Sequence, residues 1–240
     1  MGYRLSVIIP ARNEYRLIRA TLDCVLSAVG RLGPMQAEVI VVDNASTDGT
    51  WDILQRYVNE GLIRAIQLNQ LGAARARNHG RVHAYGEILV FVDADTQVSP
   101  DCLQRIVEHC DHRGIEAGIT RLAGLEGGLR SRLWWSFWEQ VRRLPLCRAK
   151  AMPALMFCTA KVFDEFGPFD ESVAIGEEWP ILANHYRRRR QNFVYDRSIT
   201  ALSSNRRMQA LTFGYSRTFL KYVWAILHRS GRLNYSDRIR

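Results

Sequence analysis

The sequence predicts an α/β domain with a mostly parallel central sheet and helices on both faces of that sheet. In residues 1–112, short apolar runs that are typical of buried strands alternate four times with segments of helical periodicity, as in consecutive βα units. Neither a linker nor an internal repeat interrupts the chain. We therefore expect one domain that covers residues 1–240.

Ile88–Val92 is apolar on both faces, which suits a strand inside a parallel sheet. Asn13 is expected to cap the first helix, and Ser99 with Pro100 to begin the fourth. The strands are predicted at Leu5–Ile9, Glu38–Val42, Ile63–Leu68 and Ile88–Val92, and the helices at Leu17–Val29, Trp51–Val58, Gly72–Tyr85 and Ser99–Cys110.

The second half is less regular, and we expect it to complete a site that the first half begins. Short strands are predicted at Ile115–Thr120, Ala154–Thr159 and Phe193–Tyr195. Helical segments are predicted at Leu129–Leu146, Phe163–Phe166, Gly176–Arg190 and Gln209–His228, the last of them amphipathic.

The net charge of +9 is concentrated in the second half of the chain. Residues 1–112 hold 11 basic and 13 acidic side chains, a balance of −2, whereas residues 113–240 hold 22 and 11, a balance of +11. Nearly all of the basic residues are Arg, which suits bidentate contacts with phosphate. Nucleic acid, a nucleoside diphosphate or an anionic membrane surface would each suit this charge.

The five cysteines lack metal-ligand spacing and are odd in number, so we expect reduced thiols in a cytosolic protein. The first residues lack the charged region and long apolar run of a secretory signal. No stretch reaches the roughly 18 apolar residues that span a bilayer. The prediction is a cytoplasmic protein without a transmembrane helix.

Asp93 and Asp95 directly follow the apolar run Ile88–Val92. In parallel α/β sheets, ligands bind beyond the carboxyl ends of the strands, and two residues separated by one point to the same side of an extended chain. Mg²⁺ binds one or two such carboxylates together with substrate phosphates, so the pattern indicates a metal–diphosphate site. A polar turn in which one Asp caps the next helix is the alternative.

Four segments in this order resemble glycosyltransferase family 2, whose members are inverting enzymes with the GT-A fold. They are Ser6–Glu14, Val41–Thr50, Gly72–Gly80 and Asp93–Asp95, the last resembling the Asp-x-Asp motif of the family. Phe166–Glu171 followed by Glu177 and Glu178 resembles the segment that holds the catalytic acid pair. The resemblance covers residues 4 to about 207 and implies a single GT-A domain.

The resemblance implies that residues 1–112 bind a nucleoside-diphosphate sugar, that residues 113–210 bind the acceptor, and that 209–230 form a C-terminal amphipathic helix. A base and ribose pocket is implied at Pro10, Ala11, Asn13 and Glu14. Asp43 would accept a hydrogen bond from the base.

The other residues implied by the resemblance would bind the ribose, the metal and the diphosphate of the donor. Arg77 would lie against the base or the diphosphate, with a solvated helix face as the alternative. Asp93 would face the ribose, and Asp95, with Asp93 beside it, would hold Mg²⁺ or Mn²⁺ against the diphosphate. Arg206 or Arg207 would close over the diphosphate.

The catalytic base is where this sequence departs from the family pattern, because Glu177-Glu178 stands where the family usually has Glu-Asp. Glu178 takes the base position and Glu177 lies beside it. The longer Glu side chain shifts the carboxylate by about 1.5 Å, and such shifts alter rates. Two alternatives remain: acidic residues that favour the first turn of a helix, and an anionic acceptor such as a polyprenyl phosphate, which needs no base.

The aromatic helix at Leu129–Leu146 suits either the core or a membrane interface, because Trp134, Trp135 and Trp138 are flanked by Arg on both sides. If the aromatic face is exposed, the acceptor is expected to be lipid-linked, with the protein peripheral on the inner face of the cell membrane. Arg207 is followed by Met208, so the Gln-x-x-Arg-Trp motif of processive synthases is absent.

The sequence therefore predicts a metal-dependent, inverting, non-processive glycosyltransferase that uses a nucleoside-diphosphate sugar and a glycan or polyprenyl-linked acceptor, without nucleic acid as a partner. One alternative is a nucleotide-sugar-binding protein without turnover, which the unusual Glu177-Glu178 pair permits. The other is a nucleic-acid-binding protein, which the charge suggests although the basic residues form no recognisable module.

Overall fold

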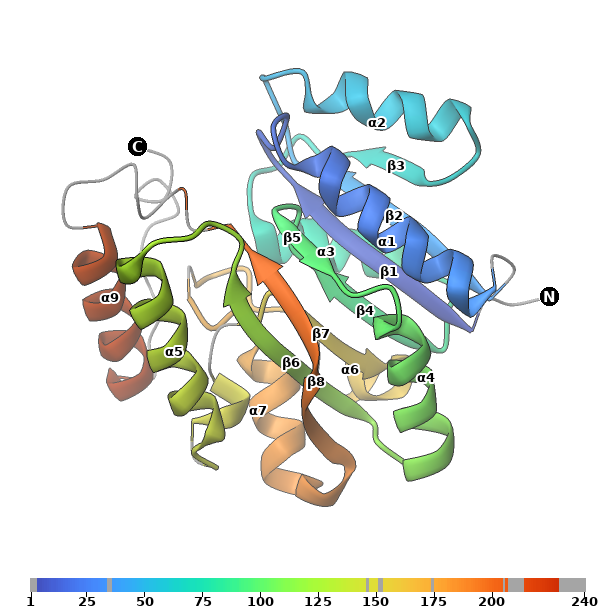
Figure 1. The fold of residues 1–240 in the computed structure, drawn as a ribbon. Coiled ribbons are helices and arrows are strands. Elements are labelled where there is room, and N and C mark those ends of the chain that lie inside the picture. The colour runs from blue at the N-terminus through green and yellow to red at the C-terminus, as the bar shows by residue number, and fades with distance from the viewer. Residues whose placement is uncertain are drawn as a thin grey trace.

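One mixed sheet of eight strands, in the order β3-β2-β1-β4-β7-β6-β8-β5, connects both halves of the chain (Figure 1). The computed structural model describes residues 4–33, 36–145, 147–150, 153–173, 175–204, 206 and 214–228. The strands are β1 Leu5–Ala11, β2 Ala37–Asp43, β3 Arg64–Gln67, β4 Ile88–Val92, β5 Thr96–Val98, β6 Ala117–Gly124, β7 Leu155–Thr159 and β8 Phe193–Ser203.

Helices cover both faces of this sheet, as the sequence predicts. They are α1 Ile18–Leu32, α2 Thr50–Asn59, α3 Ala73–Val82, α4 Cys102–Arg113, α5 Leu129–Arg143, α6 Ala160–Phe166, α7 Trp179–Arg188 and α9 Gly214–His228, with 3₁₀ turns η1 Arg148–Lys150 and η2 Arg190–Asn192. One buried apolar cluster joins the sheet to α1, α2, α4 and α5, and a second joins its other face to α3, α6 and α7.

The first four predicted strands form the parallel part of the sheet. β1 lies between β2 and β4 and pairs parallel with both, while β3 pairs parallel with β2 at the edge. Every residue of β2 and β4 is buried, which explains why these strands read as continuous apolar runs.

The second half of the sheet is mixed in direction. β7 pairs antiparallel with β4 and β6, whereas β6 pairs parallel with β8. β8 continues eight residues beyond the predicted end at Tyr195, because Asp196, Arg197 and Ser198 interrupt its apolar pattern where the pairing with β6 shifts register. The three-residue β5, which pairs antiparallel with the end of β8, was not predicted at all.

Two predicted helix caps are wrong. Helix α1 begins at Ile18 after an N-cap at Leu17, so Asn13 does not cap it. Asn13 instead has a φ of 53° and turns the loop after β1. Helix α4 begins at Cys102 after an N-cap at Asp101, because Thr96–Val98 form a strand and the chain needs further residues to turn into the helix.

Helix α5 decides between the two interpretations of its aromatic residues. Trp134, Trp135 and Trp138 are buried in the core, whereas Leu133 and Phe137 are exposed. Phe137 contacts Phe219 of α9 with ring centroids 5.4 Å apart, so these two helices pack side by side (Figure 1). The tryptophans therefore belong to the core, and the exposed side of α5 is a narrower apolar stripe.

Two remaining expectations concern the cysteines and the membrane. All five cysteines are free thiols. Within the described ranges, none of the helices is both long and apolar enough to cross a bilayer.

Gly86, which precedes β4, lies against the backbone of β1, so the residue here must lack a side chain. A Cβ on Gly86 would lie 2.5 Å from the Leu5 carbonyl carbon and the Ser6 nitrogen. We expect Gly86→Ala to destabilise the fold by about 1–3 kcal/mol, because backbone atoms cannot move aside as a side chain can. Chemical denaturation would measure the change.

Gly30 in helix α1 provides the matched control, because a Cβ there meets nothing within 4 Å. Gly30→Ala should stabilise the protein by about 0.5–1 kcal/mol through helix propensity. Equal effects of the two substitutions would show that the close approach of Gly86 to β1 does not limit the packing.

Candidate functional site

The candidate site lies at the carboxyl ends of β1, β2 and β4. Because β1 lies between the other two in parallel register, Ala11 at its end, Asp43 at the end of β2 and Asp93 just after β4 share one edge of the sheet. Ala11 is buried and Pro10 is half-buried. The structure thus brings these predicted site residues together.

The loops after β1 and β2 are hydrogen-bonded into one unit. The Asn13 amide donates to Ser46 Oγ at 3.0 Å, and the Thr47 amide donates to Asn13 Oδ1 at 2.8 Å. The Glu14 amide donates to Thr50 Oγ1 at 2.8 Å. Asn13 and Glu14 are therefore held in place by the second loop, so the two loops form one fixed wall at this edge.

Asp43 is a buried carboxylate with spare hydrogen-bonding capacity. Burial raises its pKa above the ordinary value, and hydrogen bonds from Ser46 only partly oppose this. Its Oδ1 is buried and has no hydrogen-bond partner among the described residues. A buried acceptor without a donor is costly, so this atom fits a ligand that supplies an N–H group.

Asn44 is a functional residue that sequence reasoning missed. Its side chain donates to the Gln70 carbonyl at 2.6 Å and accepts from the Gly72 amide at 2.8 Å. These bonds fix the start of helix α3, and with it Arg77, relative to the end of β2. The only signal was its place inside the quoted segment Val41–Thr50.

Arg77 joins the end of β4 to the acid pair. Its guanidinium donates to Asp93 Oδ1 at 2.5 Å and pairs with the Glu177 carboxylate, which lies 100 residues away in sequence. It also lies over the Phe169 ring, 5.5 Å from the centroid. Although burial alone would lower the pKa of Arg77, Glu177 and Asp93 raise it, so the group stays charged. The solvated alternative for Arg77 is wrong.

Asn78, one residue further along α3, fixes the segment that precedes the acid pair. Its Oδ1 accepts from the Phe169 amide at 2.9 Å, and its Nδ2 donates to the Phe169 carbonyl at 3.0 Å and to Glu171 at 2.9 Å. Arg75 pairs with the same Glu171 at 2.8 Å. These contacts link two segments that the sequence shows only as separate motifs.

Glu178 faces the same small cavity as Arg77 and Asp93. The cavity is about 20 Å³, the scale of one water molecule, and is closed by the apolar side chains of Phe91, Pro153, Met156 and Phe169. Burial, and secondarily the neighbouring Glu177, raises the pKa of Glu178 to about 7. Such a carboxylate changes protonation near neutral pH, as a general base requires.

Glu178 also occupies the N-cap position of α7, but its side chain makes no capping hydrogen bond. Glu177 and Glu178 are 8% and 9% exposed, so neither is a solvated residue of a first helical turn. A favourable interaction with the helix dipole would explain acidic residues at the start of α7, but it does not explain why both are buried.

Asp95 and Arg206 lie where the end of β8 approaches the end of β4. The Ser204 amide donates to the Asp95 carbonyl at 3.2 Å, and Arg206 pairs with the Glu14 carboxylate. Arg206 thus contacts the loop after β1, while Arg207 lies outside the described residues.

The groups available to a metal are carboxylate oxygens, which suit Mg²⁺ or Mn²⁺. Asp95 is half-buried, and Asp93 is engaged by Arg77. Across the residues that the structure describes, no cluster of three or more His, Cys, Asp or Glu side chains forms a metal cage. This donor set fits a cation that is bound jointly by the protein and substrate phosphates.

The family model for glycosyl transferase family 2 matches residues 6–162. The chain belongs to glycosyltransferase family 2. This matched range includes β1 to β7, and with it Asp43, Arg77, Asp93 and Asp95.

Relatives in this family come from several organisms. An alignment of 177 residues with glycosyltransferase AglE of Haloferax volcanii shows 30% identity. This alignment covers 72% of this chain and 58% of AglE. An alignment of 126 residues with the poly(ribitol-phosphate) beta-N-acetylglucosaminyltransferase TarS of Staphylococcus aureus shows 29% identity. This alignment covers 52% of this chain and 22% of TarS. The chain thus spans only part of these longer proteins.

Solved structures confirm the GT-A fold. A mannosyltransferase from Pyrobaculum calidifontis, in complex with GDP-Man and Mn²⁺, superposes with a TM-score of 0.70 and 21% identity over 96% of this chain and 66% of the other. S. aureus TarS 1–349 in complex with UDP superposes with a TM-score of 0.64 and 19% identity over 98% of this chain and 68% of the other.

The raised pKa of Glu178 has a consequence for stability. Between its ordinary pKa of 4.5 and its folded value of about 7, the folded state holds a proton that the unfolded state releases, so stability falls as pH rises through this window. We expect Glu178→Gln to stabilise the protein by about 2–3 kcal/mol at pH 8 and by little at pH 4.5. Denaturation at the two pH values measures this.

Glu177→Gln is the control, because it removes a partner of the buried Arg77. It should destabilise the protein at pH 8 by about 1–3 kcal/mol. If Glu178→Gln proved neutral at both pH values, the Glu178 carboxylate would not be strained by burial.

Proposed function

We propose that this protein is a metal-dependent, inverting, non-processive glycosyltransferase that moves a sugar from a nucleoside-diphosphate donor to a hydroxyl of a glycan or lipid-linked acceptor. The observation that carries the proposal is the cavity where Glu178, with a pKa of about 7, faces Arg77 and Asp93. A proton acceptor and a fixed cation thus stand together at the carboxyl edge of the sheet, where such folds bind ligands.

The donor would lie along the ends of β1, β2 and β4. Asp43, whose Oδ1 lacks a partner among the described residues, would accept a hydrogen bond from the base. Asn13 and Glu14 would line the base and ribose pocket, with Pro10 and Ala11 as its floor. Their hydrogen bonds to the second loop set that wall before a ligand arrives, which lowers the ordering cost of binding.

The diphosphate would be bound by cationic groups. Arg77 would lie beside the diphosphate and keep Asp93 toward the ribose, and Arg206 would move from Glu14 to the diphosphate. Asp95 would hold a divalent cation that, when bound, offsets the charge which builds on the leaving diphosphate.

Glu178 would act as the general base. Its ionised carboxylate takes the proton of the acceptor hydroxyl as that oxygen bonds to the anomeric carbon and the bond to the diphosphate breaks, so the configuration inverts in a single displacement. Glu177 would keep Arg77 in position rather than accept the proton, since its carboxylate is paired with that guanidinium.

The names of relatives support a cell-envelope acceptor. They include poly(ribitol-phosphate) transferases, a putative teichuronic acid biosynthesis glycosyltransferase of Bacillus subtilis and succinoglycan biosynthesis protein ExoO of Rhizobium meliloti. A dolichol-phosphate mannosyltransferase of Pyrococcus furiosus adds a lipid phosphate to this range. The sugar, the base and the linkage are not implied by these names.

Thermal shift with nucleoside diphosphates tests the donor site. We expect one nucleoside diphosphate to raise the Tm in the presence of Mn²⁺, because a ligand of the folded state stabilises it according to its concentration over Kd. Asp95→Ala should abolish the dependence on Mn²⁺. If no nucleoside diphosphate raises the Tm in the presence of Mg²⁺ or Mn²⁺, the proposed donor site is wrong.

Turnover separates an enzyme from a protein that only binds the nucleotide sugar. Glu178→Gln should keep the Tm shift but lower the transfer rate about 10²–10⁴-fold, the usual contribution of a general base. Binding without nucleotide release for any acceptor would favour the nucleotide-sugar-binding alternative. A strongly salt-dependent affinity for RNA or DNA that nucleotide sugar leaves unchanged would favour the nucleic-acid alternative.

We also infer that the exposed side of α5 and α9 contacts an anionic membrane surface. Leu129, Leu133 and Phe137 recur every four residues along α5, and Leu220 and Trp224 are exposed on the adjoining α9. Exposed arginines accompany them at positions 130, 132 and 217. Apolar side chains among cations suit the interface of an anionic bilayer. Residence on the inner face of the cell membrane remains a prediction.

Vesicle flotation tests this contact. The protein should float with vesicles of phosphatidylglycerol but not phosphatidylcholine, and Leu133→Gln with Phe137→Gln should reduce binding at least fivefold, since about two apolar contacts are lost. Val82→Gln, which changes an exposed apolar residue on α3, is the control. Equal loss with the control, or equal binding to both lipids, contradicts the inference.

A further inference from the structure

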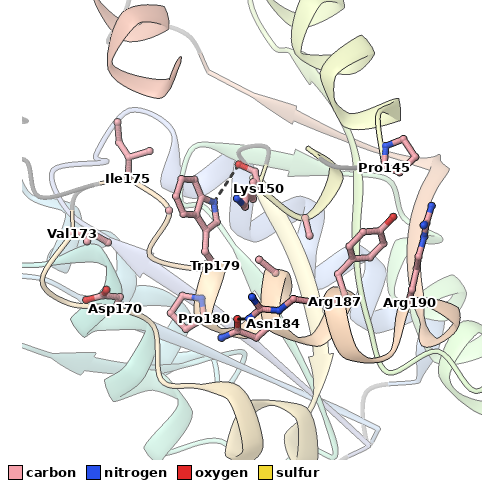
Figure 2. Close-up of a pocket in the computed structure, with 14 residues that line it drawn as sticks. Pro145, Lys150, Asp170, Val173, Ile175, Trp179, Pro180, Asn184, Arg187 and Arg190 are labelled. Atoms are coloured by element: carbon pink, nitrogen blue, oxygen red, sulfur yellow. Dashed lines mark hydrogen bonds between the residues drawn. The ribbon is translucent and has the colours of Figure 1, made fainter. Parts of the chain in front are cut away.

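A groove of about 600 Å³ lies beside α7, next to the segment that carries the acid pair (Figure 2). Its walls come from α7, from η1 and from Asp170, Val173, Ile175 and Gly176. Gly176 and Trp179, which both line it, are the chain neighbours of Glu177 and Glu178. A ligand in the groove would therefore lie beside the catalytic segment.

Two of the four consecutive arginines at positions 187–190 line the groove. Arg188 and Arg189 turn toward Glu165, at 3.9 Å and 2.8 Å, and both lie over the Phe166 ring. Arg187 and Arg190 line the groove instead. The run is thus divided into a paired set and a set directed at the groove.

Three cations line the groove: Lys150, Arg187 and Arg190. In the described part of the chain, none of them has a carboxylate within ion-pair distance; Arg187 donates only to Asn184 Oδ1, at 2.5 Å. Such cations are available to an anionic ligand.

One lining carboxylate, Asp170, opposes these cations. It accepts hydrogen bonds from the Ser172 amide at 2.9 Å and the Ser172 hydroxyl at 2.6 Å, so it is engaged within its own turn. Three cations and one such anion leave the lining with a net charge of +2.

Aromatic rings position two of the cations. Lys150 Nζ lies 5.6 Å from the centroid of the Trp179 ring, and the Arg190 guanidinium carbon lies 5.5 Å from that of Tyr186. The Trp179 indole donates to the Lys150 carbonyl at 3.2 Å, shown as the dashed line in Figure 2. Fixed cations lose less freedom on binding an anion than free side chains do.

We propose that this groove binds a phosphate-bearing glycan or polyol acceptor, with Lys150, Arg187 and Arg190 on its phosphate groups. The inference rests on the proposed function, and it adds a chemical class to the acceptor. An acceptor held by its phosphates keeps a neutral hydroxyl as the nucleophile, which suits a carboxylate base such as Glu178. The volume of the groove, about 600 Å³, lies within the range of ligand-binding clefts.

Fluorescence anisotropy with a labelled oligo(glycerol phosphate) tests the proposal on the full chain. Binding should weaken with salt, and Arg187→Gln with Arg190→Gln should weaken it at least tenfold, since two charge-assisted contacts are lost. Arg188→Gln, a neighbour in the same run that pairs with Glu165, should change it less than twofold. If Arg188→Gln weakened probe binding equally, the effect would come from overall charge, and the proposed groove site would be wrong.

Competition identifies the chemistry that is bound. Unphosphorylated dextran should not displace the probe, and an oligonucleotide of equal charge should displace it at least tenfold less well than unlabelled oligo(glycerol phosphate). Displacement by millimolar inorganic phosphate alone would indicate a site for the free ion, and equal displacement by the oligonucleotide would indicate a nucleic-acid surface. Either result overturns the proposal.

The donor measurement on the same preparations separates the two proposals. A Tm shift by nucleoside diphosphate and Mn²⁺ without binding of the probe would reject the groove and leave the proposed function in place. Probe binding that depends on Arg187 and Arg190, without any nucleotide shift, would reject the donor site while the groove still binds a phosphate polymer.

Discussion

The paired contacts of Arg77 are the interaction on which the rest of the site depends. This guanidinium binds Asp93 at the end of β4 and Glu177 before α7, so it connects the parallel half of the sheet to the segment that carries the acid pair. Its positive charge also offsets the repulsion among the carboxylates of Asp93, Glu177 and Glu178. The position of Glu178 is therefore a consequence of Arg77, and Arg77 in turn depends on Asn44 and Asn78 for the placement of α3.

The parallel half of the fold was predictable because its inner strands β1, β2 and β4 are buried on both faces and leave apolar runs, as in Ile88–Val92. The second half was less so, since β8 contains polar residues and β5 has three residues in all. Contacts between segments that are distant in sequence could not be predicted from local sequence patterns either. Nothing in the spacing of Asn78 and Phe169 shows that they exchange two hydrogen bonds.

The candidate site follows the same division. Asp43, Asp93 and Arg77 were found because they follow strands or lie in segments that resemble the family, and the structure brings them to one edge. The raised pKa of Glu178 could not be read from the sequence, because it arises from burial among Phe91, Met156 and Phe169. The division of the arginine run at 187–190 likewise needed the positions of Glu165 and of the groove.

The ion pair between Arg206 and Glu14 forms a latch across the loop after β1, which is the proposed nucleotide-binding wall. A donor that needs both residues must first open this latch, and its apparent affinity is then the intrinsic affinity multiplied by the fraction of molecules already open. Arg206 is about one-third exposed, whereas the Glu14 side chain is only 2% exposed, so this ion pair is partly buried and salt screens it only weakly. Added salt would therefore weaken the binding of the phosphates while it leaves the latch largely closed.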